Sequence, residues 1–178
     1  MKKNNVLVLA PHADDEILGC GASIAKHIEK KDNVYVAILT NANIGDSKLF
    51  SKNKINIIRK ECKSSNNYLG VKKIIFRNFP APKLDQFPIY KIADVIKKML
   101  QNYNINILYI PHHGDLHVDH KYISEASIIA SRPLENINIK KIFSYETLSE
   151  TEWGMPYNHL RFKPNYFNVI NKKHINKK

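Results

Sequence analysis

Hydrophobic residues are distributed along the chain in two alternating patterns. Short continuous apolar runs, rich in β-branched residues, have the length and composition of strands that are buried in a parallel sheet. They predict strands over residues 6–10, 33–39, 71–76, 105–110 and 142–145. The stretches between these runs carry apolar residues at helical spacing, and they predict helices over residues 16–30, 55–69, 89–100 and 117–131.

The strand-helix alternation occurs four times and predicts an α/β fold. Because crossovers between parallel strands are right-handed, the helices cover both faces of one sheet. We therefore expect a Rossmann-like three-layer fold with a mostly parallel sheet. The chain has 178 residues, 43% of them hydrophobic, which is enough for one sizeable core. We expect a single domain over residues 1–170 and a basic, disordered tail over residues 171–178.

The formal net charge of +12 is typical of proteins that bind nucleic acid or an anionic membrane surface. We favour neither, because the excess is nearly all Lys, a usage that AT-rich coding also produces; an attraction for anionic substrates is still expected. No apolar run approaches 18 residues and the N-terminus lacks the apolar core of a signal peptide, so we expect neither a membrane span nor export. Cys20 and Cys62 are too few for a disulfide framework, which favours the cytoplasm.

The end of the first predicted strand carries candidate metal ligands. Residues 11–16 read Pro-His-Ala-Asp-Asp-Glu, and in an open α/β sheet ligands bind at the carboxyl ends of the strands. His12 and Asp15 are three residues apart, so both can reach one ion from a single turn. Asp14 is then left as a free carboxylate, a base for a water molecule that the ion activates. On its own this motif is more typical of a helix N-cap.

A second polar stretch follows the fourth predicted strand and includes four of the eight histidines. His117 and His120 share one face of a helix start, so one of them can complete the metal site while the other stands beside the substrate. Three nitrogen and oxygen ligands with one open position describe a catalytic zinc site, which activates water at about pH 7. Such a site suits amide hydrolysis, with Asp14 taking the proton and a protonated His117 stabilising the oxyanion. Asp119 is a candidate for holding an imidazole by its second nitrogen.

The two stretches together resemble a known family. Residues 11–16, the Leu-Gly-Cys-Gly at 18–21 and residues 115–120 (Asp-Leu-His-Val-Asp-His) are similar to the two signature motifs of the PIG-L or LmbE-like zinc-dependent N-deacetylases. The resemblance extends over most of the chain, and Ala13 stands where most members carry a proline. That family removes acetyl groups from N-acetylglucosamine-type amino sugars. The resemblance therefore implies a hydrolase with one zinc ion and a small N-acetylated sugar as substrate.

The resemblance also implies a role for individual residues. The zinc ligands are expected to be His12, Asp15 and His120, and the general base is expected to be Asp14. His117 is expected to polarise the carbonyl or to act as the acid, and Asp119 to orient His117. Arg59 aligns near an arginine that contacts substrate in some members. Trp153 is a second candidate substrate contact, because it can stack on a sugar ring, but it suits equally well the attachment of the C-terminal segment to the core.

Other interpretations fit parts of the sequence. Two His and one carboxylate also describe the facial triad of non-haem iron oxygenases, in which Asp14 has no evident role. A basic nucleic-acid-binding module accounts for the charge but not for the motifs, and a non-catalytic sugar-binding member of the family is a third alternative. Asp115 is expected to cap the helix that follows it, and His174 to be an ordinary surface residue.

Overall fold

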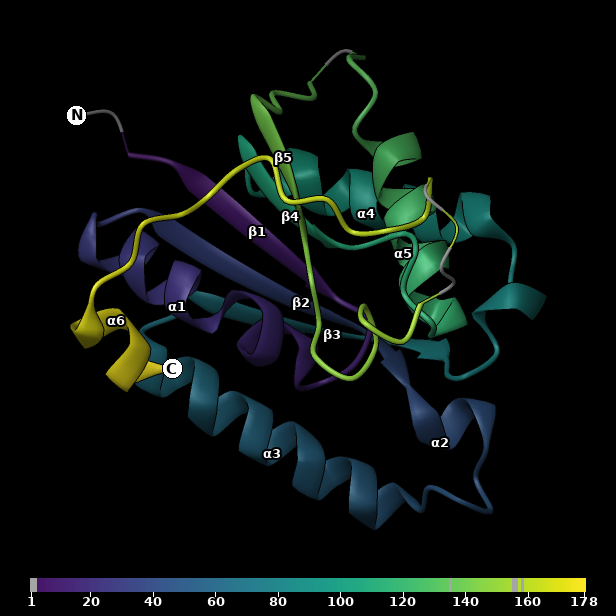
Figure 1. Ribbon diagram of the computed structural model, residues 1–178. Coiled ribbons are helices and arrows are strands. Elements are labelled where there is room, and N and C mark those ends of the chain that lie inside the picture. The colour runs from purple at the N-terminus through teal and green to yellow at the C-terminus, as the bar shows by residue number, and fades with distance from the viewer. Residues whose placement is uncertain (1–2, 135, 155–156, 158) are drawn as a thin grey trace.

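The computed structural model describes residues 3–134, 136–154, 157 and 159–178 (Figure 1). Within these residues five parallel strands form one sheet in the order β3-β2-β1-β4-β5. The strands are β1 (Asn5–Ala10), β2 (Asn33–Asn41), β3 (Lys73–Pro80), β4 (Ile107–Pro111) and β5 (Lys141–Tyr145). The helices are α1 (Asp15–Glu29), α2 (Ala42–Gly45), α3 (Lys52–Leu69), α4 (Ile89–Asn102), α5 (Val118–Ala130) and α6 (Lys172–Lys177), with a 3-10 turn at Leu84–Gln86. The predicted α/β fold with a parallel sheet is confirmed.

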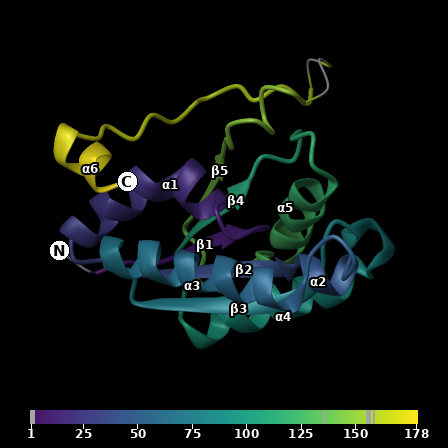
Figure 2. The ribbon, with the colours of Figure 1, turned by 90° about the horizontal axis from the view of Figure 1, so that it is seen from below.

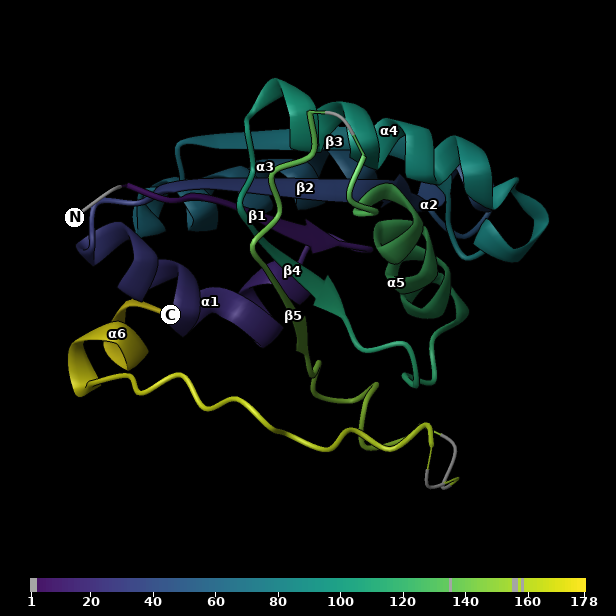
Figure 3. The same cartoon turned by 90° about the horizontal axis from the view of Figure 1, so that it is seen from above.

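Each face of the sheet has its own hydrophobic core, because alternate strand residues point to opposite faces. Val6 and Val8 of β1 pack with side chains of α1 and α3, whereas Leu7 and Leu9 pack with side chains of α4 and α5. Figures 2 and 3 show α1 and α4 on opposite sides of the sheet. The central strands are therefore covered on both faces, which explains their continuous apolar sequences.

The topology brings two loops together at one edge of the sheet. All strands are parallel, so their carboxyl ends lie at the same edge, and β1 pairs directly with β4. The connections from β1 and from β4 lead to α1 and α5 on opposite faces, which makes the gap between these strands the switch point where α/β proteins bind ligands. Both sequence motifs begin at this point.

The C-terminal segment differs from our expectation of a disordered tail, because residues 172–177 form α6 against α1 (Figure 1). The Asn171 side chain accepts a hydrogen bond from the His174 backbone (3.1 Å), and the Asn171 backbone donates to Nδ1 of His174 (3.2 Å). His174, expected at the surface, is buried and contacts Glu29 at 2.6 Å. The reciprocal cap and this long-range contact order a segment whose composition alone predicts fraying.

Candidate metal centre and active site

The turn between β1 and α1 places three of the predicted site residues. The backbone N–H of His12 donates to Oδ2 of Asp15 at 2.8 Å, which closes the turn and fixes the Asp15 carboxylate at the start of α1. Asp15 is buried, whereas its neighbour Asp14 is exposed. Asp14 occupies the N-cap position of α1, but its side chain makes no capping hydrogen bond, so a role as a simple helix cap does not describe it.

Three side chains from the two loops form a compact cluster that is able to hold a metal ion. Oδ2 of Asp15 lies 3.4 Å from Nδ1 of His12 and 3.4 Å from Nε2 of His120. Ligands about 2.0–2.2 Å from a tetrahedral ion lie about 3.3–3.6 Å from one another, so these spacings fit such an ion. Nε2 of His120 is buried and has no hydrogen-bond partner among the described residues, as a ligand atom aimed at an ion would be. The donor set and its geometry therefore fit a divalent cation.

A second group of close potential ligands consists of His12, His117 and Asp119. Most of its ligand atoms already have hydrogen-bond partners within the protein. Asp119 accepts hydrogen bonds from Leu84 N (3.3 Å) and from Nε2 of His12 (3.1 Å), and Nδ1 of His117 accepts the Asp119 backbone N–H (3.1 Å). We therefore infer that these hydrogen bonds hold the side chains of the first cluster in position and that this group does not bind a second ion.

Asp119 holds an imidazole by its second nitrogen, as expected, but the imidazole is that of His12 and not of His117, and Asp115 has a different role from the one expected. The carboxylate of Asp119 holds His12, and only its backbone N–H orients His117. Asp115 does not cap α5, whose N-cap residue is His117. Instead Oδ2 of Asp115 accepts from Nδ1 of His120 at 2.8 Å, and Oδ1 accepts from the Thr151 hydroxyl at 2.7 Å. Each of the two histidines of the cluster thus has a buried carboxylate on its outer nitrogen, which leaves the inner nitrogen free.

The carboxylates shift the pKa values of the clustered groups. Burial alone lowers the pKa of His12, but Asp119 and Asp15 more than compensate and raise it to about 10. The pKa of His120 is raised to about 9 in the same way, by Asp115 and Asp15 against the effect of burial. Burial opposes ionisation of Asp15, yet its contacts with the two imidazoles hold its pKa below the usual range. The cluster therefore attracts positive charge, whether protons or a metal cation.

Asp14 and His117 stand beside this cluster without belonging to it. Asp14 is open to solvent, but the neighbouring protein partly desolvates its carboxylate, and this effect together with the adjacent Asp15 charge raises the pKa of Asp14, which makes it a better proton acceptor. Burial and the neighbouring His12 lower the pKa of His117. Because Nδ1 of His117 accepts a backbone N–H, its ring is neutral with the proton on Nε2. His117 is thus suited to donate a hydrogen bond as a neutral imidazole, and not as the protonated group that we expected.

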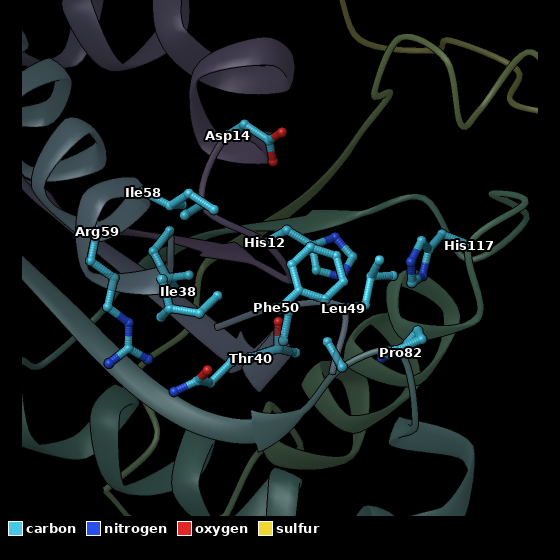
Figure 4. A pocket seen from close by; sticks show the side chains of 15 residues that line it. His12, Asp14, Ile38, Thr40, Leu49, Phe50, Ile58, Arg59, Pro82 and His117 are labelled. Atoms are coloured by element: carbon cyan, nitrogen blue, oxygen red, sulfur yellow. The ribbon is translucent and has the colours of Figure 1, made fainter. Parts of the chain in front are cut away.

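A pocket of about 480 Å³ opens onto these residues (Figure 4). Its lining combines the catalytic candidates His12, Asp14 and His117 with Arg59 at the opposite end from His117. The other lining residues are Ala13, Ile38, Thr40, Asn41, Ala42, Leu49, Phe50, Ile55, Ile58, Ala81 and Pro82. Sequence reasoning did not bring these walls together, since they come from β2, α2, α3 and the loops around residues 49–50 and 81–82, which are far apart in the sequence.

The two predicted substrate contacts fall in different places. Arg59 lines the pocket, and its Nη2 donates to the carbonyl of Arg77 and to Oδ1 of Asn78, both at 2.7 Å. Trp153 is 61% exposed and is not part of the described lining of the pocket. A sugar-stacking role for Trp153 therefore has no support from its position.

Gly45 allows α2 to form one wall of this pocket. A Cβ atom at this position would overlap the backbone carbonyl of Ala81, which lines the pocket together with Ala42 of α2. Only glycine permits this close approach of the two backbone segments.

In the described part of the chain, no helix is both long enough and apolar enough to cross a bilayer.

Comparisons with known proteins agree with this geometry. A family model described as PIG-L, GlcNAc-PI de-N-acetylase, matches residues 7–131. The chain is 28% identical over 172 residues to the uncharacterized deacetylase YaiS of Escherichia coli K12, covering 94% of this chain and 87% of that protein. It is 29% identical over 135 residues to a probable N-acetyl-alpha-D-glucosaminyl L-malate deacetylase 2 of Bacillus cereus, covering 72% of this chain and 61% of that protein.

A solved structure supports the fold independently. The N,N'-diacetylchitobiose deacetylase from Pyrococcus horikoshii superposes with a TM-score of 0.76 at 23% identity. The match covers 98% of this chain and 67% of that one. At this identity the likeness establishes the shared fold.

Proposed function

The chain belongs to the PIG-L family of deacetylases, and from this premise we propose that it is a zinc-dependent hydrolase that removes the N-acetyl group from an amino sugar or its conjugate. The observation that carries the proposal is the placement of Asp15 at 3.4 Å from one nitrogen of each of two histidines, with Asp14 free beside them. Two imidazoles, one carboxylate and an open position are the ligand set of catalytic zinc. The three predicted ligands are thus His12, Asp15 and His120.

When bound, the ion would supply Lewis-acid activation of water and of the amide carbonyl. Asp14 accepts the proton that the attacking water loses as the C–O bond forms. The Nε2–H group of His117 donates to the carbonyl oxygen, where negative charge develops. Asp14 then returns the proton to the amine nitrogen as the C–N bond breaks, so that acetate and a free amino sugar are released.

Two further features support the substrate and the compartment that we propose. The matching family model and the Bacillus cereus relative are both named for N-acetylglucosamine derivatives. Their names favour an N-acetylglucosamine derivative as the substrate that is hydrolysed. Cys20 and Cys62 are buried free thiols, which favours a reducing compartment such as the cytoplasm.

The alternatives make different predictions. An iron oxygenase with the same ligands needs oxygen for turnover and has no use for the Asp14 base. A nucleic-acid-binding module predicts salt-sensitive binding that survives the loss of His12 and Asp15. Family membership and the position of Asp14 favour hydrolysis over both.

The proposal is tested by measuring acetate release from a panel of N-acetylated sugars and nucleotide sugars, with and without a chelator. We expect release that stops with the chelator and returns with Zn²⁺. The variant Asp14→Asn should keep its bound metal and lose about 10²- to 10⁴-fold in turnover, because only the base is removed. Wild-type turnover in this variant would exclude Asp14 from the mechanism, and no acetate from any substrate would reject the proposed activity.

A further inference from the structure

The walls of the pocket next to Asp14 suit hydrocarbon better than hydroxyl groups. Beyond the catalytic residues the pocket is bounded by aliphatic and aromatic side chains, among them Ile38, Phe50, Ile55 and Ile58. Ile38 and Ile55 are buried in the floor, while Phe50 and Ile58 are half-buried around it. The pocket is large enough for a small organic molecule, and a bare acetyl group fills only a small part of it.

The few polar side chains on these walls already have protein partners. The Thr40 hydroxyl donates to the carbonyl of Pro11 at 2.8 Å. Asn41 donates to Asn78 at 3.1 Å and accepts from the backbone of Asn43 at 3.0 Å. Arg59 is directed to the carbonyl of Arg77 and to Asn78. Apart from the remaining N–H groups of Arg59, sugar hydroxyls that entered this region would lose water without gaining matched partners, which is unfavourable.

We propose that the natural substrate carries a hydrocarbon group next to the scissile amide, and that this group occupies the apolar part of the pocket between Phe50 and Ile58. Two sources supply the same chemistry: an N-acyl chain longer than acetyl, or an alkyl or aryl aglycone on the sugar. The inference rests on the proposed function, because it assumes that the amide reacts between Asp14 and His117. It adds a preference for a hydrocarbon group on the substrate, which the deacetylation of N-acetylglucosamine itself does not require.

The experiment uses two substrate series on the metal-loaded protein. One series varies the acyl group of methyl N-acylglucosaminide from acetyl through butanoyl to hexanoyl, and the other varies the aglycone of N-acetylglucosaminide from methyl through butyl to hexyl. We expect kcat/KM to rise about fourfold for each methylene that enters the pocket, in one of the two series. The series that responds identifies the source of the hydrocarbon group.

A matched pair of variants locates the effect. Ile58→Thr keeps a β-branched wall residue but shortens it and makes it polar, and it should flatten the dependence on chain length. Ile57→Thr is the same substitution on the neighbouring residue, which is 56% exposed and outside the described lining, and it should leave the dependence unchanged. The same ligands bound to the metal-free protein give dissociation constants by calorimetry, a readout that does not depend on turnover.

The outcomes separate this inference from the proposed function. Release of acid that is equally fast along both series, with equal dissociation constants, overturns the inference and leaves the deacetylase activity standing. Chain-length-dependent binding with no acid released from any member overturns the proposed function instead. An equal response of Ile57→Thr and Ile58→Thr would also overturn the assignment to this pocket.

Discussion

The substitution Asp115→Asn tests the metal centre, because it removes one charge and almost no volume. Nδ1 of His120 donates to Asp115 at 2.8 Å, and both side chains are almost completely buried. The carboxylate fixes the proton on Nδ1 and makes the opposite nitrogen a better ligand. A hydrogen bond to a buried charge contributes about 1.5–3 kcal/mol, which agrees with the about 10- to 100-fold loss of metal affinity that follows removal of such a partner. We expect this loss for Zn²⁺, measured by competition against a chelator of known affinity.

The matched control is Asp94→Asn, which makes the same change of charge at an exposed position on α4. It should bind Zn²⁺ as the original protein does. Thermal unfolding of both metal-free variants checks that the fold is retained. Wild-type affinity in a folded Asp115→Asn protein would refute the reasoning, and equal losses in both variants would trace the effect to net charge and not to His120.

Three further predictions follow from the described contacts. In the metal-free protein the pKa values of about 10 for His12 and about 9 for His120 mean that both rings carry protons at neutral pH, so Zn²⁺ affinity should rise steeply with pH. Calorimetry in buffers of different ionisation enthalpy should detect about two released protons, and release of none would contradict this. Asn171→Ala removes the N-cap of α6 and should lower the free energy of unfolding in urea by about 1 kcal/mol with turnover unchanged, whereas Asn176→Ala should change neither. Gly45→Ala places a methyl group against Ala81, so we expect a loss of stability of about 1–3 kcal/mol and a higher KM; wild-type values would show that the segments move apart freely.

The fold was predictable from the sequence because the central strands are buried on both faces. The run over residues 6–10 has no polar residue to interrupt it, and β1 occupies Asn5–Ala10. The end of the edge strand β3 was harder to predict. This strand continues through the exposed Arg77 and Asn78 to Pro80, where one face is open to solvent. The helix α2 has only four residues and therefore no apolar period that a sequence pattern can register.

The site was predictable where its geometry is local. Residues three apart at a helix start share a face, so the pairing of His12 with Asp15 follows from sequence spacing. The partners that hold the imidazoles do not follow from it, because Asp119 reaches His12 across 107 positions. Asp115 was expected to cap α5, but that helix begins only at Val118, which leaves the Asp115 carboxylate free to meet His120. The capping prediction failed because it placed the N-cap two residues before the observed N-cap, His117.

Adjacent carboxylates at the start of α1 acquire opposite properties because of a single step along the backbone. Asp15 is the first residue of the helix and points into the protein, where two imidazoles and the backbone N–H of His12 favour its charged form and lower its pKa. Asp14 lies just before the helix and points into the pocket, where partial desolvation and the charge of Asp15 raise its pKa. One carboxylate is thereby suited to hold a cation and the other to carry a proton. The opposite pKa shifts of the two carboxylates therefore depend on where α1 begins, and we expect that shifting this start by one residue would abolish the difference.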